Sequence, residues 1–458
     1  MNEAASLKIG ISGVRGVVGE SLTPQLAAAM AQAFGTYLGG GTVIVGRDSR
    51  ASGEMIKGAV LAGLLAVGCQ PVDIGLSATP TIQVYTKESW ASGAIEITAS
   101  HNPKQWNGLK FISGAGLFLS GLQVEEFLDI YHQGEFSLAD VDRIKSLRLD
   151  PDPARLHREK LLAYFNVGLI SPRRFKVALD CCNGAGAVLG PSYLQALGCE
   201  VVSINDVPNG LFAHDPEPIP ENITELCRMV KRSGADVGFV QDADADRLAI
   251  VDETGEPLGE ELTIALAAEY ILRRTKGAVV VNQSTTRAID DIGRKYGVPV
   301  IRTKTGEINV VERLLSLPGG AALAGEGNGG VILPAIHPCR DSFTAMGVIL
   351  EFMAATGKKP SELRREVPEY HMIKDKIAGT REQASGLIRR LRKKYEGQAA
   401  LSLLDGLKVE RPDHWTLIRP SNTEPIIRLQ VEARTRGEAE DALARLKKDL
   451  GEAAAWKL

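Results

Sequence analysis

The hydrophobic residues of this chain recur as short apolar runs, each followed by a polar loop. Three of the runs continue in the same way, because the loop leads into a helix and a glycine then precedes a second apolar run. β-Branched residues dominate these runs, as is typical of strands, and a glycine often marks the end of a helix. The paired runs start at residues 42 and 68, 176 and 198, and 278 and 297.

This alternation of strands and helices predicts the α/β class. We expect three similar α/β domains with mixed, largely parallel sheets, whose functional loops follow the carboxyl ends of strands. In the last part of the chain the order of elements changes to a helix over 383–395, strands around 407–409 and 415–419, and a closing helix over 437–450. This part is predicted to be an α+β domain of another type.

The length of the chain also favours several domains, since a single hydrophobic core stops growing at about 250–300 residues and this chain has 458. Pro151 and Pro153 lie in an acidic stretch that is typical of a linker, and Asp252–Gly255 has the composition of a turn. The predicted domains are 1–149, 150–252, 253–366 and 367–458.

The composition of the chain argues against several classes of function. The formal net charge of −3 and the lack of a long basic run argue against a protein that binds nucleic acid or a membrane surface. The six cysteines show no CxxC spacing, so we expect reduced thiols rather than a zinc cluster or disulfides. The first residues lack a signal-peptide pattern and no apolar run approaches about 20 residues, so we expect a soluble cytoplasmic protein.

One candidate nucleophile follows the apolar run that ends at Ile97. Ser100 lies in the stretch Thr98-Ala99-Ser100-His101-Asn102-Pro103, where a loop is expected. A serine hydroxyl is a weak nucleophile unless a base, a metal or a positive environment activates it. We therefore expect another part of the chain to supply such a group.

The strongest further signal is the stretch Asp242-Ala243-Asp244-Ala245-Asp246-Arg247. In an extended segment, aspartates at alternate positions project to one side, and a divalent cation removes the repulsion among them. A small number of oxygen ligands suits Mg²⁺. Ca²⁺ is the alternative, but an EF-hand would have glycine at position six and glutamate at position twelve, where this chain has Arg247 and Glu253, so only the glutamate fits. A solvated acidic turn is the other interpretation, and the apolar runs on both sides disfavour it.

A serine beside a magnesium ion indicates phosphoryl transfer, in which cationic groups spread the charge of the transition state. Lys110 is a candidate for proton transfer if burial and neighbouring cations lower its pKa, although it could equally be a surface lysine. His101 is the alternative base, or it only orients the loop. Arg15 lies among glycines and can approach an anion closely, unless this stretch is only a flexible turn.

Two more loops have the composition of ligand sites. The loop Gly325-Glu326-Gly327-Asn328-Gly329-Gly330 offers a carboxylate and an amide suited to sugar hydroxyls, although a plain turn has the same composition. The loop from Arg419 to Arg428 has an arginine at each end and hydroxyl and amide groups between them, which together can bind a phosphate. A capped hairpin turn is the alternative for this loop.

Taken together, the serine stretch, the aspartate stretch and these two loops resemble the α-D-phosphohexomutase family, whose members include phosphomannomutase/phosphoglucomutase and phosphoglucosamine mutase. The resemblance extends over essentially the whole chain, with the motifs in the family's order. It implies four domains, the last with a TATA-binding-protein-like fold. It also implies an enzyme that interconverts hexose 1-phosphate and hexose 6-phosphate, with a hexose 1,6-bisphosphate as intermediate and activator.

The resemblance also implies roles for single residues. Ser100 would be the phosphoserine and would share one Mg²⁺ with Asp242, Asp244 and Asp246. The cationic and proton-transfer groups would be Arg15, Lys110 and Arg247, and His101 stays the alternative base. The sugar would be contacted by Lys304, Glu326 and Asn328, and the phosphate that is not transferred by Arg419, Ser421, Asn422, Thr423 and Arg428.

The chain departs from the family pattern in the sugar loop. Many bacterial members have Gly-Glu-x-Ser-Gly-His there, whereas this chain has Asn328 in place of the serine and Gly330 in place of the histidine. The change removes one candidate acid or base. We expect glucose and mannose phosphates as substrates, with glucosamine phosphate as the alternative.

Two other functions compete with a mutase. A metal-dependent phosphomonoesterase would also use a serine and a metal, but the seven histidines show no cluster for a second metal. A non-catalytic sugar-phosphate sensor would have no need of an intact Ser100, Lys110 and aspartate set. The expected partners are small sugar phosphates, with no nucleic acid or membrane, and we expect a monomer or homodimer.

Overall fold

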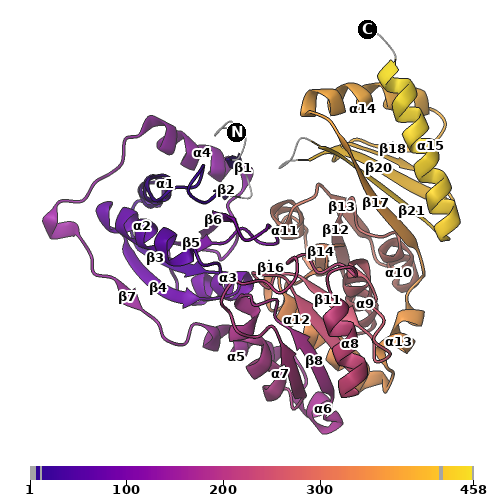
Figure 1. Ribbon diagram of the computed structural model, residues 1–458, viewed down its shortest axis with the longest axis horizontal. Coiled ribbons are helices and arrows are strands. Elements are labelled where there is room, and N and C mark those ends of the chain that lie inside the picture. The colour runs from indigo at the N-terminus through magenta and orange to yellow at the C-terminus, as the bar shows by residue number, and fades with distance from the viewer. Residues whose placement is uncertain (1–6, 11–12, 422–425, 456–458) are drawn as a thin grey trace. The chain divides into compact units, whose positions relative to one another are not determined.

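The computed structural model describes residues 7–10, 13–421 and 426–455 (Figure 1). The chain divides into two compact units. The first unit comprises the residues up to Tyr270 together with Asn328–Arg364, and the second comprises Ile271–Gly327 together with the residues from Arg365 onwards. Both units combine sheets with helices, as the α/β prediction requires.

A seven-stranded sheet forms the start of the first unit. Its strands are β1 (Lys8–Gly10), β2 (Gly13–Val17), β3 (Thr42–Arg47), β4 (Gln70–Leu76), β5 (Gly93–Ile97), β6 (Trp106–Ser113) and β7 (Arg148–Leu149). They lie in the order β1-β2-β6-β5-β3-β4-β7, with β5, β3 and β4 parallel and β6 antiparallel to both β5 and β2. The helices are α1 (Pro24–Tyr37), α2 (Gly53–Ala66), α3 (Thr79–Glu88) and α4 (Gly121–Gln133).

A four-stranded sheet follows in the same unit. Its strands are β8 (Lys176–Asp180), β9 (Glu200–Ile204), β10 (Val237–Gln241) and β11 (Leu248–Val251), in the order β11-β10-β8-β9. Strands β10, β8 and β9 are parallel, whereas β11 returns antiparallel to β10, so the connection between them is a short turn. The helices are α5 (Ala154–Tyr164), α6 (Val167–Ile170), α7 (Gly190–Ala196) and α8 (Thr224–Ser233).

A hairpin and a buried helix complete the first unit. These elements are β15 (Gly330–Leu333), β16 (His337–Arg340), α12 (Ser342–Thr356) and α13 (Pro360–Leu363). Strands β15 and β16 pair antiparallel. Helix α12 is buried along almost its whole length and contacts β11, β15, α5 and α6. A helix that is apolar on all sides is expected to be enclosed in this way.

The second unit begins with three parallel strands in the order β13-β12-β14. They are β12 (Ala278–Asn282), β13 (Val300–Thr303) and β14 (Ala321–Glu326), and the helices are α10 (Ala288–Tyr296) and α11 (Glu307–Leu315). The division between the units falls within α9 (Glu260–Arg274). Helix α11 contacts all three strands and so covers this part of the sheet.

The C-terminal part of the second unit is an antiparallel sheet with helices on one face (Figure 1). Its strands are β17 (His371–Ala378), β18 (Ala400–Ser402), β19 (Leu407–Glu410), β20 (His414–Pro420) and β21 (Ile426–Ala433). Their order is β17-β21-β20-β19-β18. Helices α14 (Arg381–Tyr395) and α15 (Arg436–Ala455) contact each other and the central strands.

The main sequence predictions are confirmed. The three predicted strand pairs are β3 with β4, β8 with β9 and β12 with β13, and each pair is parallel. The C-terminal part has the different, α+β order of elements, and the six cysteines are free thiols. None of the helices within the described residues is long and apolar enough to cross a membrane. The four domain boundaries stay predictions.

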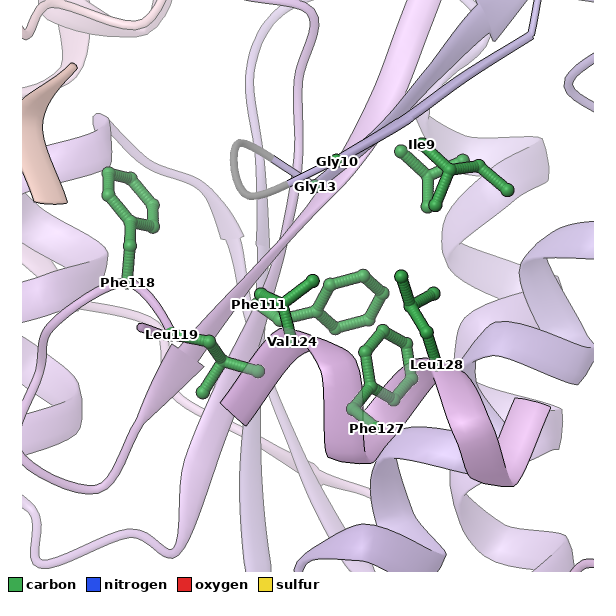
Figure 2. Close-up of a pocket in the computed structure, with 10 residues that line it drawn as sticks. Ile9, Gly10, Gly13, Phe111, Phe118, Leu119, Val124, Phe127 and Leu128 are labelled. Carbon is green, nitrogen blue, oxygen red and sulfur yellow. The ribbon is translucent and has the colours of Figure 1, made fainter. Parts of the chain in front are cut away.

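An aromatic cluster holds α1 and α4 against the seven-stranded sheet. Phe111 on β6 and Phe127 on α4 have ring centroids 4.5 Å apart, and the ring of Phe34 on α1 lies 5.1 Å from that of Phe111. Figure 2 shows Phe111, Val124 and Phe127 close together, with Ile9 of β1 on the far side of a small cavity. That cavity measures about 10 Å³. It is no larger than one water molecule, so this region is packed core and not a ligand site.

We predict that Phe127→Ala destabilises the first unit by about 3–5 kcal/mol, because a buried ring is lost and the cavity is only partly refilled. Urea unfolding followed by circular dichroism measures the shift in the free energy of unfolding. The matched control is Leu122→Ala on the same helix, where the side chain is 65% exposed, and its effect is expected to stay within about 0.5 kcal/mol. Equal effects of the two substitutions would contradict the prediction.

Candidate active site

Ser100 lies on the loop directly after β5, and its backbone is held on both sides. The residue is only 2% exposed and has a φ of +52°. This left-handed conformation costs a residue other than glycine about 1–3 kcal/mol. The N–H of Ser100 donates to Oγ1 of Thr98 at 2.9 Å, and its carbonyl accepts from Nη2 of Arg50 at 2.6 Å. These two hydrogen bonds stabilise the strained turn and so fix the direction of the serine.

His101 follows Ser100 and lies beside its hydroxyl. Nδ1 of His101 is 3.4 Å from Oγ of Ser100. Burial of the ring, followed by the charges of Arg247 and Arg15, lowers the pKa of His101 well below its usual range. The imidazole is therefore neutral near pH 7 and has a nitrogen that can accept a proton. This geometry fits the predicted role as a base, which stays a prediction.

Asp242, Asp244 and Asp246 come together at the connection between β10 and β11. All three are fully buried, and one oxygen of each lies within 4.8 Å of the others. The expectation of an extended segment with alternating side chains is wrong. The segment is a turn in which Ala245 has a φ of +57°, and the N–H of Asp246 donates to Oδ1 of Asp242 at 3.1 Å. The turn, not strand alternation, brings the carboxylates to one side.

The three carboxylates fit a divalent cation. Each keeps one buried oxygen without a hydrogen-bond partner among the described residues, namely Oδ2 of Asp242, Oδ1 of Asp244 and Oδ1 of Asp246. Burial, followed by the charges of the other two aspartates, raises the pKa of Asp242 well above its usual range. A hard cation with oxygen ligands satisfies these oxygens and removes the repulsion among them. The donor set therefore suits Mg²⁺.

Lys110 projects from β6 towards the same carboxylates. Its Nζ lies 2.7 Å from Oδ2 of Asp244 and 3.3 Å from Oε2 of Glu96. Burial acts to lower the pKa of Lys110, but the charges of Asp244 and Glu96 outweigh it and hold this pKa above its usual value. The condition set for proton transfer, a pKa lowered by burial and neighbouring cations, is not met, because the nearest charged neighbours of Lys110 are carboxylates. The geometry pairs Lys110 with the carboxylates of Asp244 and Glu96.

Two arginines complete the positive side of the site. Arg15 on β2 donates from Nη1 to Oδ1 of Asn102 in the serine loop at 3.1 Å. Arg247 has its Nε 3.8 Å from Oδ2 of Asp242 and 3.7 Å from Oδ1 of Asp246. In both arginines Nε is buried and lacks a hydrogen-bond partner among the described residues. An incoming anion such as a phosphate would satisfy these donors.

The second unit holds the predicted sugar contacts Glu326 and Lys304. Glu326 ends β14 and is 2% exposed, and its Oε1 accepts from Nδ2 of Asn282 and from the N–H of Gly306, both at 2.7 Å. The bond to Gly306 ties Glu326 to the loop that carries the exposed Lys304. The N–H of Thr305 in that loop donates to Oδ2 of Asp405 at 3.1 Å. The structure thus joins the Lys304 loop to Glu326.

Arg419 and Arg428 face each other across β20 and β21 as a cross-strand pair. Like charges directly opposite in a sheet destabilise it. Burial lowers the pKa of Arg419, and its Nε is buried without a hydrogen-bond partner among the described residues. Ser421 opens the connection between the strands, and its N–H donates to the carbonyl of Ile426 at 2.9 Å. A phosphate between the two arginines would remove their repulsion.

Three further contact residues were predicted, namely Asn328, Asn422 and Thr423. Asn328 belongs to the first unit and is engaged within its own turn, where Oδ1 accepts from the N–H of Gly330 at 3.3 Å. Asn422 and Thr423 lie outside the described residues. Their roles stay predictions from the resemblance alone.

Comparison with known proteins gives the same order of domains. The models of four domain families match the chain, and they are described as phosphoglucomutase/phosphomannomutase, alpha/beta/alpha domain I (6–137), domain II (156–255), domain III (259–370) and C-terminal domain (376–448). A protein of Thermococcus kodakarensis named "Phosphoglucomutase/phosphomannomutase" is 39% identical over 443 residues, which cover 95% of this chain and 96% of that protein. The chain belongs to the phosphoglucomutase/phosphomannomutase family.

Other members of the family also match nearly the whole length of the chain. A protein of Methanopyrus kandleri named "Probable phosphoglucosamine mutase" is 37% identical over 438 residues, covering 94% of this chain and 95% of its own. Among solved structures, a phosphoglucomutase/phosphomannomutase family protein from Burkholderia thailandensis superimposes with a TM-score of 0.86 at 27% identity, covering 100% of this chain and 99% of its own. The family resemblance, the fold class and the enzyme class, a phosphohexomutase, are thereby confirmed.

Several buried groups of this family member were not found from its sequence. Arg50 bonds the serine loop and Glu96 pairs with Lys110. Oγ1 of Thr79 donates to Oδ2 of Asp244 at 3.0 Å, and Arg340 on β16 forms an ion pair with Asp246. Only Arg50 has a local signal, because it follows β3 in a polar loop of the repeated kind. The others reach the site through strand pairing or through α3.

We predict that Asp242→Asn lowers the affinity for Mg²⁺ by about 100-fold or more, since one of three anionic ligands is lost. Isothermal titration of the full chain with MgCl₂ measures this. The matched control is Asp206→Asn, which changes an exposed aspartate outside the triad and is expected to leave the affinity within about twofold. Unchanged Mg²⁺ binding by the Asp242 variant would show that the triad is not the metal site.

Proposed function

We propose that this enzyme catalyses the reversible transfer of a phosphoryl group between O1 and O6 of a hexose phosphate, with Ser100 as the carrier. The observation that supports this best is the environment of Ser100 in the first unit. Arg15 bonds Asn102 of the serine loop, the charges of Asp244 and Asp246 act on Arg15, and the charge of Arg247 acts on His101. Ser100 lies in a strained turn, and the site holds carboxylate oxygens and arginine N–H groups that lack hydrogen-bond partners among the described residues. This combination suits phosphoryl transfer.

The proposed cycle starts with phosphorylated Ser100. The bond between phosphorus and Oγ breaks while a bond forms between phosphorus and the free sugar hydroxyl. The hydroxyl loses its proton and Oγ gains one, so the products are a hexose 1,6-bisphosphate and a free serine. After the sugar turns round, the other phosphate of the bisphosphate returns to Oγ. The number of phosphorus–oxygen bonds stays constant, so the cycle consumes no co-reactant.

The residues of the first unit have distinct roles in this scheme. His101 lies 3.4 Å from Oγ of Ser100, which places it to take the proton from Oγ and to return it. Lys110 and Arg247 supply fixed positive charge, and Arg15 orients the serine loop and offers Nε to a phosphate oxygen. A Mg²⁺ held by the triad and phosphoserine would stabilise the charge on the transferring group.

The residues of the second unit bind the rest of the substrate in this proposal. Glu326 and Lys304 contact sugar hydroxyls, and Arg419 and Arg428 bind the phosphate that is not transferred. The phosphate loop would also include Ser421, Asn422 and Thr423. Binding chiefly through phosphate lets the sugar be held in two opposed orientations, which the cycle requires.

For the sugar we propose glucose and mannose phosphates, with glucosamine phosphate as the second candidate. These sugars differ at C2, so a few contacts decide among them. Asn328 and Gly330 stand where many relatives have serine and histidine, which leaves the loop fewer groups to read that position. The second candidate is supported by the relative named "Probable phosphoglucosamine mutase".

We predict that Ser100→Ala abolishes the conversion of glucose 1-phosphate to glucose 6-phosphate, with a loss of at least about 10⁴-fold in kcat, because the carrier oxygen is missing. Intact-mass spectrometry of the wild-type enzyme should show one added phosphate on Ser100. Enzyme freed of phosphate should be inactive until glucose 1,6-bisphosphate primes it.

The same assay separates the competing functions. Release of inorganic phosphate without isomer formation would indicate a phosphomonoesterase. Binding of sugar phosphate with neither reaction would indicate a sensor. A Ser100→Ala variant with full activity would overturn the proposed mechanism.

We predict that kcat/KM for glucose 1-phosphate and for mannose 1-phosphate agree within about tenfold, and that glucosamine 1-phosphate is poorer by more than about tenfold, as expected when one contact at C2 discriminates. Side-by-side turnover of the three substrates with the same enzyme preparation measures this. A reversed order, with glucosamine 1-phosphate best, would favour the second candidate.

A further inference from the structure

The side chain of Arg50 donates hydrogen bonds to one aspartate, to the serine loop and to the first residue of β6. A guanidinium group has five N–H donors, and all five are used here. Nε donates to Oδ2 of Asp48 at 3.0 Å, and the other four donate to carbonyl oxygens. These belong to Ser100 (2.6 Å), Asn102 (2.6 Å), Pro103 (2.8 Å) and Trp106 (3.0 Å).

Asp48 connects the same network to the other side of the serine. It is fully buried and accepts from the Nε of Arg50 and from Oγ1 of Thr98, the latter at 2.7 Å. That hydroxyl in turn accepts from the N–H of Ser100 at 2.9 Å. Both backbone groups of Ser100 are therefore held by one set of side chains. This set fixes the left-handed turn that presents the hydroxyl.

Arg50 is also closed off from solvent. It is 2% exposed, and the ring of Phe212 covers the guanidinium with its centroid 5.0 Å from Cζ. Gly210 comes so close that a Cβ there would lie 2.3 Å from the carbonyl oxygen of Ser49, at a φ of +69°. A guanidinium that is enclosed and has no spare donor cannot bind the transferring phosphate itself. Its effect on the reaction must therefore act through the loop.

We propose that Arg50 is a positioning residue for phosphoryl transfer, which holds Oγ of Ser100 in the geometry for attack and departure. This inference rests on the proposed function, in which Ser100 carries the phosphate. A lysine keeps the charge but offers three donors from one atom, so it cannot reach four carbonyls and a carboxylate together. Arg50→Lys should loosen the serine loop while leaving the substrate contacts intact.

The decisive measurement is the single-turnover rate constant of phosphoryl transfer. The full-length enzyme is phosphorylated with glucose 1,6-bisphosphate in MgCl₂, freed of ligand and mixed rapidly with glucose 1-phosphate. Loss of phosphate from Ser100 is then followed by mass spectrometry. For Arg50→Lys we expect this rate constant to fall by about 100-fold, as a misplaced reacting atom causes. The final phosphorylated fraction and KM should match those of the wild type.

A matched control and a second variant keep the test decisive. Arg47→Lys changes an arginine at the end of β3 that bonds Glu54 and the carbonyl of Asp48 but no residue of the serine loop, and its rate constant should stay within about twofold. If Arg50→Lys does not fold, Thr98→Val is measured instead. This substitution keeps the shape of the side chain but removes the hydroxyl that joins Asp48 to the N–H of Ser100. We expect a fall of about tenfold for that variant.

A wild-type rate constant in the Arg50→Lys variant would overturn the inference. If the phosphorylated fraction of that variant is also smaller, Arg50 only stabilises the fold. A wild-type enzyme that never carries phosphate on Ser100 would instead overturn the proposed function, and this inference with it.

Discussion

The burial of three carboxylates at a single turn is the constraint on which the first unit depends. An ionised carboxylate is costly to bury unless a positive charge accompanies it. Asp242, Asp244 and Asp246 are fully buried, and the chain answers with Lys110 and Arg340, which lie 134 and 94 residues away in sequence from the aspartates that they contact. Removing either cation would leave a buried carboxylate with less compensating positive charge. The pairing of β6 and the placement of β16 are therefore tied energetically to the chemistry of the turn.

Within the first unit these ion pairs do not satisfy every buried charged group. The groups that remain are carboxylate oxygens and arginine N–H donors. Within the part of the chain that the structure describes, each aspartate keeps one oxygen without a hydrogen bond, and Arg15 and Arg247 each keep an Nε without an acceptor. Folded proteins pair nearly all such buried groups, so leaving five of them in one place needs an explanation. A divalent cation satisfies the oxygens, and a phosphate satisfies the arginines. In the proposed function the site would be preorganised for both ligands, and the transfer would need little reorganisation.

The sequence predicts those parts of the structure that local patterns encode. Apolar β-branched runs and helix-ending glycines were enough for the parallel strand pairs, and motif order was enough for the family. The extended aspartate segment was wrong because an alanine, Ala245, adopts a left-handed φ that its side chain does not signal. The carboxylate neighbours of Lys110 could not be predicted, because Glu96 comes next to it only through pairing of β5 with β6. The role of Arg50 was missed because most of its partners are backbone carbonyls, which leave no signature in a sequence.

In the second unit, too, like charges lie close together, but these charges are positive. Arg419 and Arg428 oppose each other across two strands, a pairing that weakens a sheet when nothing lies between the charges. Natural sequences break such local rules chiefly at functional sites. In the proposed function a phosphate binds between these two arginines and removes their repulsion. Because a ligand stabilises whichever state binds it, a phosphate bound as in the proposed function would recover the free energy that the second unit loses by pairing two arginines. The repulsion between Arg419 and Arg428 without ligand and their attraction for a bound phosphate would then come from the same two charges.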